Sequence, residues 1–307
     1  MKLCLINHSY KYELEKLIRI FLPFEKIEFC EGEEREDQVS VTSLLKGEKE
    51  TQLSAKLLID NKSFEFSETI SNENPDYDNE CERLLAVALY NCFVKASGYV
   101  PEWGILTGVR PAKLFSRLSA DNGKASAEEW FKKGLMVSEN KISLCRETVE
   151  SENKITALSK PDSYSLYISI PFCPTRCAYC SFVSHSVEQA KGLIPEYIRF
   201  LKEELKLTAE IAKKLNLRLE TIYIGGGTPT SLTAGQIGEI MTAVKDSFDL
   251  SSLREYTLEA GRPDTVTREK LETIKNLGAT RISINPQTMN DEVLKSIGRR
   301  HTAEESE

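Results

Sequence analysis

Hydrophobic and polar positions follow one pattern before about residue 155 and a different pattern after it. In the first part, short extended runs are mixed with helical stretches, the longer of which has apolar residues at helical spacing between Leu84 and Cys92. We therefore expect a small α+β domain over residues 1–98, in the order βαβββα. Its expected strands are Lys2–Ile6, Lys26–Cys30, Val39–Leu45 and Gln52–Ile59, with a possible continuation through Phe64–Phe66, and its helices are Glu13–Phe21 and Asp78–Ala96.

A helical connector and a linker are expected over residues 99–162. The segment from Ala112 to about Ala157 is mostly helical in its pattern. The stretch Ser151–Ser163 is polar and contains Pro161, which is typical of a linker.

Residues 163–307 show strict alternation of strands and helices. This alternation predicts a parallel sheet with helices packed on it. The expected strands are Ser165–Ile170, Thr221–Ile224, Glu255–Glu259 and Arg281–Ile284, and the helices are about Ile194–Lys214, Ala234–Phe248, Arg268–Leu277 and Asp291–Ile297.

The two faces of these strands differ in polarity. Aliphatic side chains such as Ile168, Ile224 and Leu258 fall on one face, whereas Tyr167 and Glu259 fall on the other. The aliphatic face should meet the helices, so the polar face should line an interior. A closed eight-stranded barrel fills its interior with branched aliphatic residues. The polar face therefore favours an open barrel that holds a polar ligand.

Composition and charge narrow the class of protein. The chain has 307 residues, 28% of them charged, and a net charge of −7, which argues against a surface that coats nucleic acid. No stretch approaches the roughly 18 apolar residues of a membrane span, and the start does not resemble a signal peptide. We expect a cytoplasmic protein. Its eight cysteines should then be reduced thiols or metal ligands rather than a disulfide framework.

Three of the cysteines are grouped directly after the first strand of the second part, in the spacing Cys173-x3-Cys177-x2-Cys180. Three thiolates on one loop can bind three irons of a [4Fe-4S] cluster and leave the fourth iron open. A structural zinc site is the alternative, but it needs four ligands, and only His185 lies near in the sequence. The other cysteines are scattered and are expected to be buried or idle thiols.

A glycine-rich run, Gly225-Gly226-Gly227-Thr228, ends the second strand of this part. Glycines permit close approach of the backbone to a ligand, and a side chain at Gly226 is expected to block that approach. A glycine turn alone is weak evidence of binding, but its place one strand away from the cysteine loop strengthens it.

The cysteine spacing, with Tyr179 before the last cysteine, resembles the signature of radical S-adenosylmethionine (SAM) enzymes. The resemblance covers Tyr164 to the end of the chain. It implies a [4Fe-4S] cluster on Cys173, Cys177 and Cys180, whose open iron chelates SAM, and reductive cleavage of SAM to a 5′-deoxyadenosyl radical. By the same resemblance, the cofactor-binding residues are Tyr167, Tyr179, Gly226, Gly227, Thr228, Glu259, Gln287 and Arg299.

Within that family, the cysteine loop, the glycine run and the Arg281–Gln287 segment are similar to the HemN/HemW/HemZ group, and Leu106–Lys113 is most similar to HemZ-type members. The resemblance implies an oxygen-independent coproporphyrinogen III dehydrogenase, which converts propionates to vinyl groups in heme biosynthesis. Phe182 stands where established dehydrogenases have a further cysteine, so a heme chaperone of the HemW type is the alternative. The implied partners are a porphyrinogen or heme and a reductant such as flavodoxin or ferredoxin, without nucleic acid.

The expected fold is thus α/β: a partial (β/α)6 radical SAM barrel, truncated after about four β/α units and preceded by the α+β domain. Four twisted strands cannot close a barrel, and Arg281–Ile284 would remain an unpaired edge strand. We therefore expect the chain to be part of a longer protein. On its own it should assemble a cluster, cleave SAM poorly and turn over no porphyrinogen.

Overall fold

The computed structural model describes residues 1–32, 40–59, 61–182 and 184–306. The chain divides into two compact units, Met1–Thr156 and Ala157–Glu307. Among the described residues, no helix combines the length and apolar character needed to span a membrane.

The first unit contains a five-stranded sheet in the order β2-β1-β3-β4-β5. The parallel neighbours of β1 are β2 and β3, whereas β3, β4 and β5 run antiparallel in sequence. The strands are β1 (Lys2–Ile6), β2 (Glu28–Glu31), β3 (Ser40–Lys46), β4 (Glu50–Ile59) and β5 (Lys62–Ser71). The possible continuation at Phe64–Phe66 is thus a separate ten-residue strand. Val39, expected to begin a strand, lies outside the described residues.

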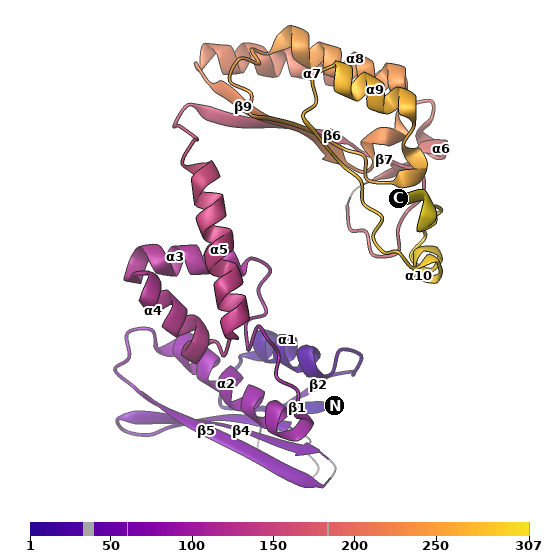
Figure 1. The fold of residues 1–307 in the computed structure, drawn as a ribbon. Helices are drawn as coiled ribbons and strands as arrows, with labels where there is room; N and C mark the ends of the chain where they lie inside the picture. The colour runs from indigo at the N-terminus through magenta and orange to yellow at the C-terminus, as the bar shows by residue number, and fades with distance from the viewer. Residues whose placement is uncertain (33–39, 60, 183, 307) are drawn as a thin grey trace. The chain divides into compact units, whose positions relative to one another are not determined.

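Two helices cover this sheet, α1 (Lys11–Phe21) and α2 (Tyr77–Ser97), as Figure 1 shows. Their apolar positions face the sheet because the spacing of three and four residues places them on one side of each helix. The shared core contains Leu14, Leu17 and Ile18 of α1, Leu85 and Leu89 of α2, and Leu53 and Leu57 of β4.

One sequence expectation about this unit was wrong. Cys4 and Cys30 form a disulfide rather than remaining idle thiols. The physical reason is the pairing of β1 with β2, in which Cys4 lies directly opposite Cys30. That pairing joins residues 26 positions apart, and no local pattern in the sequence indicates it.

The helical segment of the first unit has a core of its own. It comprises α3 (Pro111–Asn122), α4 (Lys124–Glu129), the π-helix η1 (Trp130–Gly134) and α5 (Glu139–Thr156). Phe115, Phe131, Ile142 and Cys145 are buried between these helices. Helix α5 runs through Thr156, so the linker expected from Ser151 is shorter than its polar composition indicated. Polar residues extend the helix there because most of the last turns are exposed.

The second unit contains a four-stranded parallel sheet in the order β11-β10-β9-β6. The strands are β6 (Ser163–Ile170), β9 (Arg218–Gly226), β10 (Glu255–Glu259) and β11 (Arg281–Ser283), and each coincides with an expected strand to within three residues. In the described part of the chain, β6 and β11 are the two edges of this sheet. The six-unit barrel of which the sheet would form part stays a prediction.

Helices connect successive strands of this sheet, and a further helix follows β11. They are α6 (Val187–Ala190), α7 (Ile194–Lys214), α8 (Ala234–Ser247), α9 (Arg268–Asn276) and α10 (Asp291–Ser296), with 3₁₀ turns η2 (Pro229–Ser231), η3 (Pro263–Thr265) and η4 (Glu304–Ser306). Side-chain caps fix where several of them begin. Thr233 and Gln236 form a capping box at α8, and Asn290 caps α10. A short pair, β7 (Phe172–Cys173) with β8 (His185–Ser186), follows β6.

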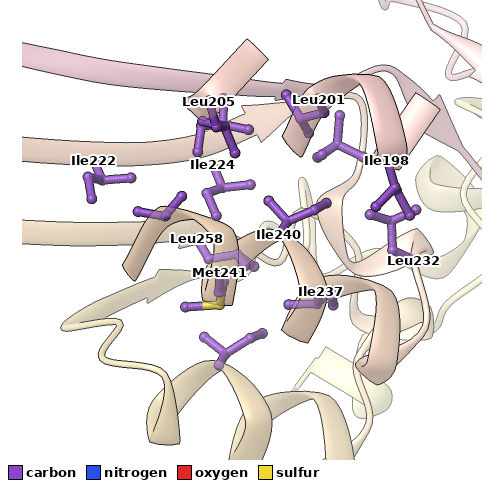
Figure 2. Close-up of a cluster of buried hydrophobic side chains, with 14 of the residues drawn as sticks. Ile198, Leu201, Leu205, Ile222, Ile224, Leu232, Ile237, Ile240, Met241 and Leu258 are labelled. Carbon is purple, nitrogen blue, oxygen red and sulfur yellow. The ribbon is translucent and has the colours of Figure 1, made fainter. Parts of the chain in front are cut away.

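The aliphatic face of the sheet packs on α7, α8 and α9, as the strand pattern predicted (Figure 1). Figure 2 shows this core, in which Ile222, Ile224 and Leu258 of the sheet meet residues of the helices. Ile282 and Ile284 are the exceptions, because 38% and 42% of their surface is exposed. On the polar face, Tyr167 is exposed and Glu259 is half-buried at the end of its strand.

Candidate cofactor site

The predicted site residues are brought together at the carboxyl ends of the parallel strands. Loops that follow parallel strands meet at one edge of a sheet, so residues far apart in the sequence line one cavity there. Its lining includes Cys173, Cys177, Cys180, Tyr179, Gly226, Gly227, Thr228, Glu259, Gln287 and Arg299. Tyr167 does not line it. Its ring is 60% exposed and stacks on Tyr223, with 5.8 Å between the ring centroids.

The cysteine loop is held by hydrogen bonds on both sides. The Cys180 N–H donates to the Cys177 carbonyl at 3.1 Å, which closes the turn, and the Ala178 N–H donates to the Ile297 carbonyl at 3.1 Å. The Sγ of Cys173 lies 3.4 Å from the Thr228 hydroxyl of the glycine run. Cys173 and Cys177 are buried, and Cys180 is half-buried.

The donor set fits an iron–sulfur cluster. Among the described residues, no three Cys, His, Asp or Glu side chains converge on one point as ligands of a single ion would. The three thiols instead line one cavity. Each cysteine of a cubane binds a different iron, so its ligands stand farther apart than those of one zinc ion. Three cysteine ligands bind three of the four irons of a cubane, which leaves the fourth iron available to a small molecule.

The glycines allow close packing between the end of β9 and its neighbours. A Cβ at Gly226 would lie 2.8 Å from the Ser169 hydroxyl, and its φ of +106° disfavours any side chain. A Cβ at Gly227 would lie 2.7 Å from the Phe172 carbonyl and 3.0 Å from the Cys173 Sγ. The glycine run therefore allows the start of the cysteine loop to pack closely against the end of β9. A side chain at Gly226 would also meet Ile170 of β6, and the expected effect of such a side chain on ligand approach stays a prediction.

Glu259 lies at the end of β10 on the polar face. Burial raises the pKa of its carboxyl above the usual value, while a hydrogen bond from Tyr223 acts in the opposite direction. The Asn285 amide lies 3.4 Å from the carboxylate. Burial and the nearby Glu259 also raise the pKa of both Tyr167 and Tyr223. Glu259 forms no ion pair with any residue that the structure describes, so its half-buried carboxylate is suited to accept hydrogen bonds from an ammonium group.

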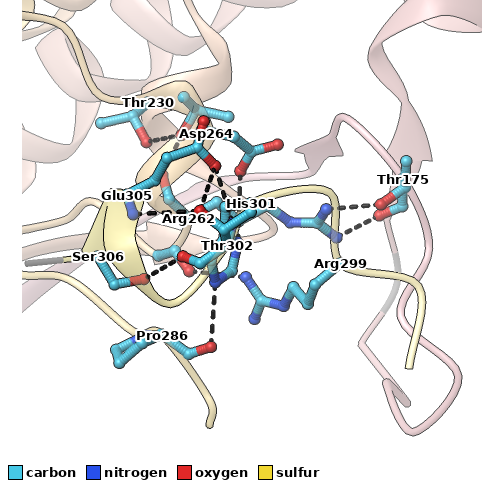
Figure 3. Close-up of polar contacts among 12 residues, drawn as sticks. Thr175, Thr230, Arg262, Asp264, Pro286, Arg299, His301, Thr302, Glu305 and Ser306 are labelled. Atoms are coloured by element: carbon cyan, nitrogen blue, oxygen red, sulfur yellow. Dashed lines mark hydrogen bonds and ion pairs between the residues drawn. The ribbon is translucent and has the colours of Figure 1, made fainter. Parts of the chain in front are cut away.

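Gln287 and Arg299 are held by specific contacts. Gln287 has a φ of +73°, a strained conformation for a residue with a side chain. The buried His301 donates from Nε2 to the carbonyl of Pro286 at 3.1 Å, directly before that residue (Figure 3). Arg299 donates to the Gly261 carbonyl at 3.0 Å and to the Tyr179 hydroxyl at 3.1 Å. His301, for which the sequence indicated no role, thus fixes the strained turn at Gln287.

The sequence analysis missed Arg262 and some other residues that line the cavity, such as Thr175 and Asn285. Arg262 is buried, lines the cavity and contacts the cysteine loop. A lone arginine between Gly261 and Pro263 gives no pattern that distinguishes it from a surface residue. The only available signal was its place just after β10, at the edge where Glu259 lies.

Comparisons with known proteins agree with this geometry. The profile of the Radical SAM superfamily matches residues 167–307. The chain is 38% identical to the oxygen-independent coproporphyrinogen-III oxidase-like protein HemZ of Bacillus subtilis (strain 168), over 74% of this chain and 46% of that protein. It is 41% identical to the heme chaperone HemW of Lactococcus lactis, over 47% of this chain and 35% of that protein. The chain thus spans about half or less of the length of these relatives.

The HemZ similarity covers 235 residues, more than the second unit contains, so it extends into the first unit. Among solved structures, coproporphyrinogen III oxidase (HemN) from Escherichia coli is similar, with 25% identity and a TM-score of 0.41 over 50% of this chain and 35% of that one. The profile match and these relatives place the chain in the radical SAM superfamily, in the HemN/HemW/HemZ group, in agreement with its cysteine loop and glycine run.

Proposed function

We propose that Cys173, Cys177 and Cys180 bind a [4Fe-4S] cluster whose open iron takes SAM. The superfamily implies both cofactors. The observation that supports these ligands is that the three thiols line the same cavity as the glycine run, Glu259 and Arg299. Cluster and SAM together supply a one-electron cleavage that yields a 5′-deoxyadenosyl radical.

The remaining polar groups fit the charges of SAM. Among the described residues that line the cavity, Glu259 is the acidic one, and its carboxylate can accept hydrogen bonds from the SAM ammonium. Arg299 retains an Nε–H without a hydrogen-bond partner in the described structure, and Gln287 lies in the same wall. These two can donate to the carboxylate and hydroxyl oxygens of SAM. His301 and Pro286 hold Gln287 in place.

Glu259→Gln should weaken SAM binding by about ten- to hundredfold. The reason is that a charge-assisted hydrogen bond contributes about 1.5–3 kcal/mol, and the amide keeps the shape but loses the charge. SAM affinity is measured anaerobically on cluster-containing protein by calorimetry. Glu255→Gln is the control, because Glu255 lies on the same face of β10 at its far end, near Arg281. Equal affinities for wild type and Glu259→Gln would remove Glu259 from the SAM site.

The raised pKa of Glu259 also predicts a pH dependence of stability. The folded state holds the proton more tightly than the unfolded chain, so the stabilisation is present below the unfolded pKa of about 4.3 and is lost as pH rises through the folded pKa. Glu259→Gln should therefore have a higher free energy of unfolding than wild type at about pH 7, with the difference vanishing near about pH 4. Urea unfolding of the cluster-free protein tests this. A less stable variant at neutral pH would contradict it.

For the substrate, we propose oxidative decarboxylation of coproporphyrinogen propionates to vinyl groups, with a reductant such as flavodoxin or ferredoxin. The supporting observation is that the similarity to the HemZ protein extends over 74% of this chain, whereas that to the Lactococcus lactis HemW protein extends over 47%. The test incubates the protein anaerobically with SAM, reductant and coproporphyrinogen III. CO₂ and vinyl products are expected. SAM cleavage without either product would exclude this substrate.

A heme chaperone is the second candidate, and Phe182 favours it. Phe182 stands where the established dehydrogenases have a further cysteine, and its side chain is exposed at the cavity. Similarity to HemW proteins extends over 145 residues of this chain for the Lactococcus lactis protein and 141 for that of Bacillus subtilis. Titration with heme separates the candidates: stoichiometric binding and transfer to an apo-protein, without CO₂ release from coproporphyrinogen, would support the chaperone.

A further inference from the structure

Arg262 occupies a fixed position between the end of β10 and the cysteine loop. Its carbonyl accepts hydrogen bonds from the N–H and the hydroxyl of Thr265, which close the turn η3 behind it. Its guanidinium points at the loop, as Figure 3 shows for its contacts with Thr175. Nη1 donates to the Thr175 hydroxyl at 2.6 Å, and Nη2 donates to the Thr175 carbonyl.

The same guanidinium reaches a proposed cluster ligand. Nη2 of Arg262 also donates to the Sγ of Cys177, at 3.0 Å. Among the contacts that the structure describes, this is a direct hydrogen bond from a cationic side chain to a cysteine of the loop. A guanidinium presents several N–H groups in a fixed plane, so one residue can hold the loop backbone and the sulfur at once.

The buried positive charge of Arg262 requires a neighbouring negative charge. Only 3% of its surface is exposed, and within the described ranges no carboxylate forms an ion pair with it. An unpaired buried cation is strongly unfavourable, so such charges are normally balanced by a neighbouring anion. The Sγ of Cys177 is in contact with the guanidinium, and a cluster bound by this cysteine and its two neighbours in the loop would supply the balancing negative charge.

We propose that Arg262 is a positioning residue that fixes the Cys177 thiolate and raises the reduction potential of the cluster. The inference rests on the cluster ligation proposed above. Hydrogen bonds to the sulfurs and the net charge around a cluster set its potential. Reduction adds an electron to the cluster, and a cationic donor on a ligand sulfur stabilises that added charge. Loss of the donor therefore makes the cluster harder to reduce.

The test is an EPR-monitored redox titration of the reconstituted chain without SAM. Arg262→Gln removes the cation, and Arg262→Lys keeps the charge with a different donor geometry. Arg176→Gln is the matched control, since it removes the same charge from an exposed position of the same loop. We expect Arg262→Gln to lower the reduction equilibrium constant at least tenfold, about 59 mV for one electron. Arg262→Lys should fall between it and wild type, and Arg176→Gln should stay near wild type.

The outcomes separate the inference from the proposed function. A wild-type chain that binds no cluster would overturn the proposed function itself. A full cluster with unchanged potential in Arg262→Gln would overturn only the role of Arg262, and an equal shift in Arg176→Gln would show that no direct bond to Cys177 is involved.

Variants of Arg262 that bind no cluster also test its proposed role. If Arg262→Gln and Arg262→Lys keep the melting temperature of the wild-type cluster-free chain yet bind no iron, the contact with Cys177 is needed for ligation, which supports the inference. If both unfold, Arg262 is a structural residue and the inference fails. Thr175→Val, which removes the hydroxyl contact of Arg262 but not its bond to Cys177, should retain both cluster and potential.

Discussion

Cys177→Ala should abolish the stable [4Fe-4S] cluster of the reconstituted chain. Cys177 is the buried central thiol of the loop, and three donors are the minimum for a cubane that keeps one open iron. Removing one leaves two irons without a protein ligand. Iron analysis should fall from near stoichiometric to a small fraction, and the EPR signal of the reduced cluster should disappear.

The control is Cys145→Ala, which removes a buried thiol from the core of the helical segment. It should cost some stability through the small cavity that it leaves but keep full iron content. A normal cluster in Cys177→Ala would overturn the ligand assignment. Stoichiometric zinc in the wild-type chain would overturn the cluster and favour the zinc alternative.

The second unit was predictable because its patterns are local. Alternation of aliphatic and polar residues in β6, β9 and β10 indicated strands with one face on helices, and Ile168, Ile224 and Leu258 do pack there. The same reasoning failed for Ile282 and Ile284, which are partly exposed at the edge. Alternation shows which side chains share a face, but not whether another element covers that face.

Features that depend on pairing between distant segments were not predictable. The disulfide of Cys4 with Cys30 requires the register of β1 with β2, and the separate strand β5 requires its pairing with β4. The extent of α5 also differed, because the polar composition of an exposed helical turn resembles that of a linker. In each case the tertiary partner, rather than local propensity, decides the structure.

The residues of the candidate site also differ in whether the sequence alone could identify them. Cys173, Cys177, Cys180 and the glycine run have a spacing that points to their chemistry without a structure. Arg262 has no such spacing, and its importance lies in a 3.0 Å contact with a sulfur 85 residues away. His301 likewise acts through the backbone of Pro286. Residues that support other residues carry little signal in one sequence, because many side chains could fill that role.

Gly227→Ala should impair cluster binding because the added methyl group would press on the start of the cysteine loop. Its Cβ would lie 2.7 Å from the Phe172 carbonyl and 3.0 Å from the Cys173 Sγ, and the contact with backbone cannot be relieved by a side-chain rotation. The end of β9 or the start of the cysteine loop must shift. We expect a loss of about 1–3 kcal/mol in the free energy of unfolding, as in other overpacked sites, and at least a severalfold fall in iron content.

Gly235→Ala provides a control with the same chemical change. Gly235 lies in the first turn of α8, and its added Cβ would meet only the Thr233 hydroxyl, at 4.0 Å. There alanine should stabilise the chain by about 0.5–1 kcal/mol, because it restricts the unfolded chain and favours the helix. Opposite signs for these two substitutions would show that the glycine run is needed for the fit between β9 and Cys173. If Gly227→Ala kept wild-type stability and iron content, the loop would be free to move away from β9, and the glycines would have to act on the ligand directly.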